Sequence, residues 1–354
     1  MSYLDSKRIV GTNTDRIGTD AISGGWKELG RHTLGSNTAP ITVSSLPDKR
    51  YYMVLRSWSG NTGLYERFNN DSGSNYSSRR SVNGNTDSTL TSQSAFPWGN
   101  AGYTSTPNFT IDYVANLAGK EKLGQRLWAM QMTAGAGTAP DRAEIVYKWS
   151  NTSDAINRMD MAVGSGTLDS GSEMVVLGYD PDDTHTDNFW EELADVSLSS
   201  ASDTLSSGTI TAKKYLWVQT FVKATGGTVE PDSRFNNDNS GSNNVSGTYA
   251  DRYNVNGGSD ATGTSLNKGV RGSGVPVSAF FNDFIINNAS NEKLVMRHVT
   301  YVSTAGAGTA PNRRETVGKW SNTSDQITDI TWHDESGSGA QMDSGSFIKV
   351  WGSN

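Results

Sequence analysis

The residues best suited to binding a ligand lie in two nearly identical polar stretches. The first reads RFNNDSGSN from Arg67 to Asn75, and the second reads RFNNDNSGSN from Arg234 to Asn243. Oxygens of Asn and Asp, with backbone carbonyls, are ligands that Ca²⁺ accepts, although the Glu of an EF-hand loop is missing. The six residues that could bind Ca²⁺ or a glycan here are Asn70, Asp71, Asn75, Asn237, Asp238 and Asn243.

The same composition also suits a turn that binds nothing. Asn and Asp side chains bond to their own backbone in turns, and glycine supplies left-handed conformations, which we expect at Gly73 and Gly241. Turn chemistry accounts for both stretches unaided, so we expect turns and keep Ca²⁺ as the alternative. No other cofactor is indicated.

Two tryptophans, Trp149 and Trp320, precede a repeated SNTSD segment. An aromatic ring beside Asn and Asp can form a platform on which a sugar stacks. A tryptophan at the end of a strand also suits a core or an interface, and we favour that position over the platform.

Residues for catalysis are harder to find. The chain has four His, in no metal-binding spacing, and no Cys. Glycosidases need two carboxylates held close together, and the sequence does not show which of its acidic residues converge. Glu144 and Glu315 follow Arg142 and Arg313 in strand-like segments, so we expect exposed ion pairs there. The sequence predicts that the chain is not an enzyme.

Two glycine-rich segments repeat without change. Residues 133–140 and 304–311 both read TAGAGTAP. A phosphate-binding loop needs a Lys-Ser/Thr pair after its glycines and a helix behind it, and neither follows here. We expect turns that connect strands.

These motifs belong to a long internal repeat. Trp26 corresponds to Trp190, and the residue offset grows from 164 to 174 along the chain, which indicates small insertions in the second copy. We predict an N-terminal arm at 1–25, a first repeat at 26–180, an acidic linker at 181–189 and a second repeat at 190–354. A period this long indicates tandem domains.

The local pattern is that of β-strands. Short segments rich in β-branched and aromatic residues are bounded by Gly, Asn, Ser and Asp. The segments are Tyr51–Leu55, Glu144–Trp149, Glu173–Leu177, Lys214–Val222, Leu294–Val302 and Phe347–Trp351. Only Phe189–Val196 suggests a helix. We therefore predict an all-β fold, with two tandem antiparallel β-sandwich (jelly-roll-like) domains and an extended N-terminal arm.

Composition limits the possible partners. The net charge is −7 and no basic run is present, which argues against a nucleic-acid partner. The sequence shows no secretory signal and no apolar stretch long enough for a membrane span. The 10 Trp, 13 Tyr and 10 Phe suffice for packed cores.

The run from RFNNDSGSNYSSRRSVNG through TAGAGTAP and KWSNTSD to GSEMVVLG resembles β-rich virion proteins of tailed viruses of marine microbes. The resemblance implies a structural component of the particle, either a capsid decoration or a tail-fibre-like appendage. It supplies no catalytic or binding residues. The alternative is a carbohydrate-binding adhesin that recognises host-surface glycans.

The partners implied are other virion proteins and further copies of the chain, in a homo-oligomer. The arm at 1–25 would attach the protein to its neighbours. The expected location is the extracellular particle, after synthesis in the host cytoplasm.

Overall fold

The computed structural model describes residues 22–23, 25–60, 63–97, 106–180, 184–185, 188–239, 248–263, 275, 277–337, 339 and 341–354. Within these ranges every regular element is a β-strand, and the strands form two antiparallel sandwiches in tandem, as the sequence predicts. No helix of the described chain is long and apolar enough to cross a membrane.

The first copy (residues 26–180) contains a sheet of eight strands and a sheet of four. In spatial order, the large sheet consists of β2 (Lys27–Thr33), β13 (Glu173–Tyr179), β4 (Tyr51–Trp58), β9 (Asn108–Ala115), β10 (Lys122–Met130), β11 (Asp141–Trp149), β6 (Tyr76–Val82) and β7 (Ser88–Gln93). The small sheet consists of β3 (Ile41–Ser44), β12 (Arg158–Val163), β5 (Leu64–Phe68) and β8 (Phe96–Pro97).

The second copy (residues 190–354) repeats this plan with sheets of eight and three strands. Its large sheet consists of β15 (Glu191–Ser197), β25 (Phe347–Ser353), β17 (Tyr215–Lys223), β21 (Ser278–Ile286), β22 (Lys293–Val302), β23 (Asn312–Trp320), β19 (Tyr249–Val255) and β20 (Ala261–Gly263). Its small sheet consists of β16 (Thr204–Ser206), β24 (Ile330–Asp334) and β18 (Pro231–Phe235). A two-stranded ribbon pairs β1 (Ile22–Ser23) with β14 (Thr184–His185).

The short segment with the best helical apolar spacing, Phe189–Val196, is not helical. Residues 191–196 belong to β15, which pairs with β25, and Phe189 and Trp190 are buried. Their apolar spacing fits a helix, but a sheet face buries the same side chains while β25 satisfies the backbone. The predicted arm falls almost wholly outside the described residues, as do 181–183 and 186–187 of the predicted linker.

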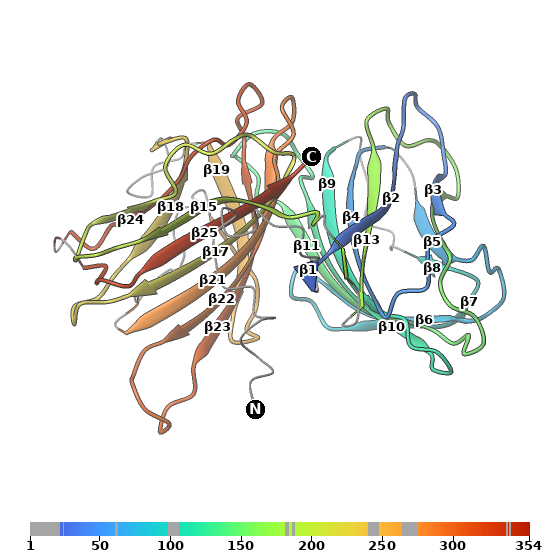
Figure 1. Cartoon of the computed structure of the whole chain (residues 1–354), viewed down its shortest axis with the longest axis horizontal. Helices are drawn as coiled ribbons and strands as arrows, with labels where there is room; N and C mark the ends of the chain where they lie inside the picture. The colour runs from blue at the N-terminus through green and yellow to red at the C-terminus, as the bar shows by residue number, and fades with distance from the viewer. Residues whose placement is uncertain are drawn as a thin grey trace.

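Each large sheet packs on its own small sheet with one face and is partly covered on the other, because the two large sheets face each other and the small sheets lie at the outer ends of the molecule (Figure 1). The inner face of each large sheet packs on its own small sheet and forms the core of that copy. The opposite face, here called the seam face, contributes to a third cluster that includes Leu55, Phe109 and Val175 of the first copy and Tyr215, Leu294 and Val317 of the second. Burial on both faces explains why β4 is almost continuously apolar, where a sheet with one wet face would alternate.

Charged side chains are buried inside both cores. In the first copy, Arg56 and Arg126 alternate with Glu66 and Asp112 in a closed ring of ion pairs whose side chains are at most 1% exposed. The Tyr147 hydroxyl also donates to Asp112, at 2.7 Å. The two arginines and the two carboxylates neutralise one another, and charged groups can be buried only when they are paired in this way.

The second copy keeps one of these pairs and adds another elsewhere. Arg297 binds Asp283 through both carboxylate oxygens and also donates to the Ser233 hydroxyl, at 3.0 Å. A separate buried pair joins Arg314 to Asp251 at 3.3 Å. Both copies therefore bury more than one arginine with a matched acid.

Candidate functional site

The first polar stretch folds into a tight turn whose side chains bond to one another. The Asp71 carboxylate accepts hydrogen bonds from the Gly73 amide at 2.8 Å, the Asn75 side chain at 2.9 Å and the Trp149 indole at 2.7 Å. Burial alone would raise the pKa of Asp71, but these bonds outweigh it and hold the pKa below its usual value. Both carboxylate oxygens therefore face N–H donors.

The second stretch repeats this arrangement. Asp238 accepts the Trp320 indole N–H at 2.7 Å and the Thr248 hydroxyl. Asn70 and Asn237 take positive φ angles of 54° and 55°, and both are exposed. Asn243, the sixth residue of the sequence-based set, lies outside the described residues.

The left-handed residues are not the ones expected. Among the described residues of the first stretch, Asn69 and Asn70 have positive φ and Gly73 does not, while Gly241 falls in a part of the chain that the structure leaves undescribed. Asn tolerates the left-handed region because its short polar side chain bonds locally. Asn69 and its counterpart Asn236 also tie the turn to the next strand, since each carbonyl oxygen accepts two backbone N–H groups.

Trp149 and Trp320 are core residues, with 0% and 1% of their surface exposed. A stacking platform needs an open ring face, so the platform interpretation is corrected in favour of the core position. The SNTSD segment after each ring is an Asx turn, in which Asn151 accepts the amides of Ser153 and Asp154 at 2.8 and 2.9 Å. Asn322 does the same in the second copy. The repeated SNTSD sequence therefore forms the same turn after each buried tryptophan.

In these turns the Asp71 and Asp238 carboxylates already accept hydrogen bonds, so few free oxygens are left for Ca²⁺ to bind. No cluster of three or more His, Asp or Glu suited to a metal occurs among the described residues. At Asp71, a cation would have to displace a buried indole N–H. The geometry favours the turn interpretation over the cation.

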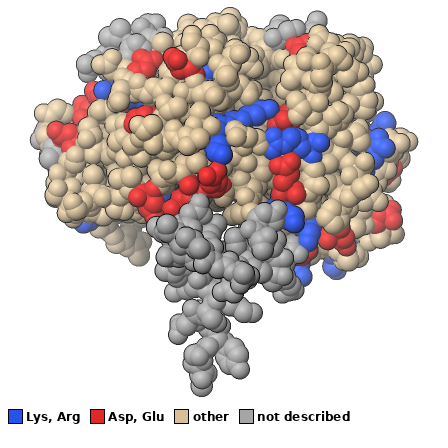
Figure 2. Space-filling view, turned by 45° about the horizontal axis from the view of Figure 1, so that its top comes forward, with Lys and Arg blue, Asp and Glu red and all other residues tan. Residues whose placement is uncertain are grey.

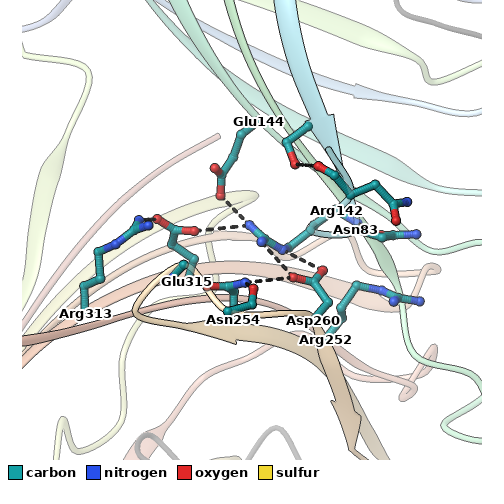
Figure 3. A network of polar contacts seen from close by, with 12 residues as sticks. Asn83, Arg142, Glu144, Arg252, Asn254, Asp260, Arg313 and Glu315 are labelled. Atoms are coloured by element: carbon teal, nitrogen blue, oxygen red, sulfur yellow. Dashed lines mark hydrogen bonds and ion pairs between the residues drawn. The ribbon is translucent and has the colours of Figure 1, made fainter. Parts of the chain in front are cut away.

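A network of polar contacts lies on the seam between the copies and centres on Arg142 (Figure 3). Its guanidinium binds Asp260 of the second copy through two hydrogen bonds, of 2.8 and 2.9 Å. It also contacts Glu144 and, at 3.3 Å, Glu315. Arg252 reaches back to Asp141 at 2.9 Å. The ion pairs expected at Glu144 and Glu315 do form, but Arg142 is buried in the seam, with 7% of its side chain exposed.

The seam also brings the carboxylates of Glu144 and Glu315 and the imidazole of His298 to one cleft of about 540 Å³. Burial raises the pKa of Glu144; Arg142 opposes this shift and the neighbouring Glu315 adds to it. Burial lowers the pKa of His298, against the attraction of Glu144. Arg142 binds the carboxylates of both Glu144 and Glu315, which belong to different copies. These residues therefore help to join the two copies.

The first TAGAGTAP loop is a docking element. Lys319 of the second copy donates to the Thr133 carbonyl, and the Gly135 amide donates to Glu292. Farther along the seam, Glu173 accepts hydrogen bonds from Lys214 at 2.9 Å and Tyr215 at 2.7 Å. The sequence shows both copies of the loop, but nothing in it indicates that one of them binds the other repeat.

A further groove, of about 830 Å³, lies on the exposed part of the first copy's seam face. Its lining includes Trp26, Tyr51, Tyr113, Leu123, Val146 and Tyr179. Leu123 and Val146 are 56% and 50% exposed, unusually high values for apolar side chains on adjacent strands. This groove could not be predicted from the sequence, because residues of the same types are buried at the matching positions of the second copy.

Charged side chains are sparse on the face of the molecule that Figure 2 shows. Figure 2 shows a face that is mostly uncharged, with basic side chains gathered near its middle and acidic ones beside them. That face presents no continuous basic surface of the kind that binds nucleic acid.

Comparisons with known proteins are uninformative about function. No protein-family model matches the chain, and no curated protein matches it significantly. Among solved structures, the mouse laminin alpha1 chain, domains LG4-5, is 11% identical, with a TM-score of 0.19 over 92% of this chain and 90% of that one. A likeness this weak carries no argument, and the fold rests on the observed sheets.

Proposed function

We propose that this protein is a structural component of a virus particle, either a capsid decoration or a tail appendage. The observation that carries the proposal is the seam. Apolar side chains of both large sheets pack in one cluster, and Arg142 adds a bidentate, buried contact with Asp260. A tandem pair joined in this way is one rigid block, which is what an assembly needs from a subunit.

The polar turns also favour this proposal over the adhesin alternative. Asp71 and Asp238, which suggested glycan binding, accept hydrogen bonds from the buried indoles of Trp149 and Trp320 within the turns. The virion setting itself is supported by the sequence resemblance, which spans both copies. In this proposal, residues 1–25 attach the block to its neighbours.

Particle composition tests the proposal. Particles purified from cells that produce the complete virus should contain the chain in many copies, detected by mass spectrometry and located by antibody labelling. Deletion of residues 2–25 should abolish its incorporation while the β-domains still fold, as judged by circular dichroism. Particles that lack the chain would contradict the virion role, and unchanged incorporation of the deletion variant would contradict the role of the arm.

A further inference from the structure

The two copies join through different parts of the same surface. The first copy uses the part of its seam face that contains Phe109 and Leu55, whereas the second uses the part that contains Tyr215, Leu294 and Val317. Strand register shows that these parts are not equivalent: Leu294 pairs with Lys319 as Leu123 pairs with Lys148. The contact is therefore heterologous, and each copy retains the half that its partner used.

The retained half on the first copy, here called the receiving face, is the groove of about 830 Å³. Its residues Tyr51, Leu123 and Val146 are 37%, 56% and 50% exposed. Their counterparts Tyr215, Leu294 and Val317 are 0%, 0% and 5% exposed, because the first copy covers them. Side chains of the same types are therefore exposed on the first copy, where no second domain covers them.

The retained half on the second copy, here called the inserting face, includes Phe280 of β21. Phe280 is 37% exposed, whereas its counterpart Phe109 is 1% exposed and lies 6.2 Å from the Tyr215 ring, measured between centroids. The second TAGAGTAP loop, residues 304–311, is exposed throughout and belongs to this face. Its twin in the first copy is docked on Glu292 and Lys319.

The polar contacts of the seam are also available a second time. Glu121 and Lys148, the counterparts of Glu292 and Lys319, form an ion pair with each other at 3.0 Å and are 41% and 44% exposed. Arg313 and Asp87 correspond to Arg142 and Asp260 and are 58% and 48% exposed. Opposite charges would therefore meet again if the inserting face docked on a receiving face.

For one polar contact of the seam, the counterpart residues on the two retained halves are both apolar. Asn288 donates to Ser57 at 3.2 Å across the seam. The counterparts on the retained halves are Leu117 and Phe221, and Leu117 is 42% exposed. A matched change of this kind is expected if the two retained halves contact each other.

We infer that the inserting face of one chain docks on the receiving face of a second copy of this chain, so that the seam repeats between chains head to tail. Such a contact closes into a ring or continues as a filament. It should be weaker than the seam within a chain, since Leu55 and Val175 are replaced by Gln219 and Lys349. Assembly should therefore depend on concentration. The inference goes beyond the proposed function and requires no particle.

The test uses purified full-length protein in sedimentation velocity over a wide concentration range. The wild type should form oligomers that grow with concentration. The double variant Leu123→Asp/Val146→Asp and the single variant Phe280→Asp should each weaken association by about tenfold or more. The matched control is Thr204→Asp, on the exposed side of the outlying small sheet, and it should associate like the wild type. Circular dichroism and thermal unfolding verify that each variant is folded.

Mixing the two variants gives the decisive result. One retains the inserting face and the other retains the receiving face, so an equimolar mixture should form a one-to-one dimer and nothing larger. A wild type that is monomeric at every concentration overturns the inference, including the case in which it associates only after removal of residues 1–21. Binding of a soluble oligosaccharide in the groove of a monomeric chain also overturns it, as does a mixture that forms no dimer.

Discussion

The cores of the two copies place their buried charges differently on almost the same set of strands. The first copy has Arg56 and Glu66 where the second has Thr220 and Ser233. Conversely, the second copy has Asp251 and Arg314 where the first has Ser78 and Ala143. In both cases the acid and the base occur together or are absent together. In these two exchanges the unit that differs between the copies is the pair and not the single charge.

Physical chemistry explains this rule. An unpaired charge inside a sandwich loses its hydration and gains nothing in return, while a pair with good geometry recovers much of that cost. The pair that both copies keep, Asp112 with Arg126 and Asp283 with Arg297, joins neighbouring strands β9–β10 and β21–β22. This contact is common to the two copies, whereas the exchanged pairs differ between them.

The largest effect should come from breaking the ring on one side. Glu66→Gln preserves shape but removes one of the two carboxylates that neutralise Arg56 and Arg126 in the ring; Asp112 is the other. We expect a loss of about 3–5 kcal/mol in the free energy of unfolding. Ser233→Ala, the matched change in the second copy, removes one hydrogen bond to Arg297 and should cost about 1 kcal/mol. Urea unfolding followed by tryptophan fluorescence measures both, and equal losses would contradict the comparison.

Transplanting the second copy's residues into the first should recover part of that loss. The variant Arg56→Thr/Glu66→Ser removes both members of the pair and leaves the Asp112–Arg126 contact. We expect it to be more stable than Glu66→Ser alone by about 2 kcal/mol, because no charge is left unmatched. A double-mutant cycle measures this coupling. Additive losses would show that Arg56 and Glu66 are not one unit.

Much of this fold follows from the sequence, and the reasons are local. The strands at Tyr51–Leu55 and Glu173–Leu177 are β-branched and aromatic runs bounded by turn residues, and the repeat itself divides the chain. The turn function of Asp71 was one of two open alternatives. The seam was not predictable, because Arg142 and Arg313 have the same residue type and similar neighbours, yet only Arg142 meets Asp260. Which half of a sheet face is covered depends on how two domains pack, and no local pattern records that.

Arg142 in the seam and its exposed counterpart Arg313 allow the seam to be compared directly with the surface. Arg142→Met removes a bidentate contact across the seam and leaves the buried Asp260 carboxylate without it. The loss should be about 2 kcal/mol. Arg313→Met, at the exposed counterpart, should cost less than about 0.5 kcal/mol at concentrations where the chain is monomeric. Thermal unfolding in dilute solution checks both values. A similar cost at the two positions would mean that the seam contact contributes little.

The smallest effect concerns pH at the opposite end of the seam. Burial would raise the pKa of Glu173, but the Thr33 hydroxyl, Lys214 and Tyr215 outweigh it and hold the pKa below its usual value of 4.5. A carboxylate whose pKa is lowered by folding stabilises the folded state above pH 4.5, and this contribution disappears as the pH falls through the lowered value. The wild type should therefore exceed Glu173→Gln in stability at pH 6–7 by a margin that shrinks below about pH 4.5.

Two positions serve as controls for the pH dependence at Glu173: its counterpart in the second copy and an exposed glutamate. The counterpart of Glu173 is Phe347, so the second copy has no carboxylate at this position to respond. Glu121→Gln, in the exposed pair with Lys148, should change the free energy of unfolding by only a few tenths of a kcal/mol. Urea midpoints measured from pH 7 to pH 3 give the margin for each variant. If the margin of Glu173→Gln stays constant over that range, the Glu173 carboxylate is not what ties Tyr215 and Lys214 to the first copy.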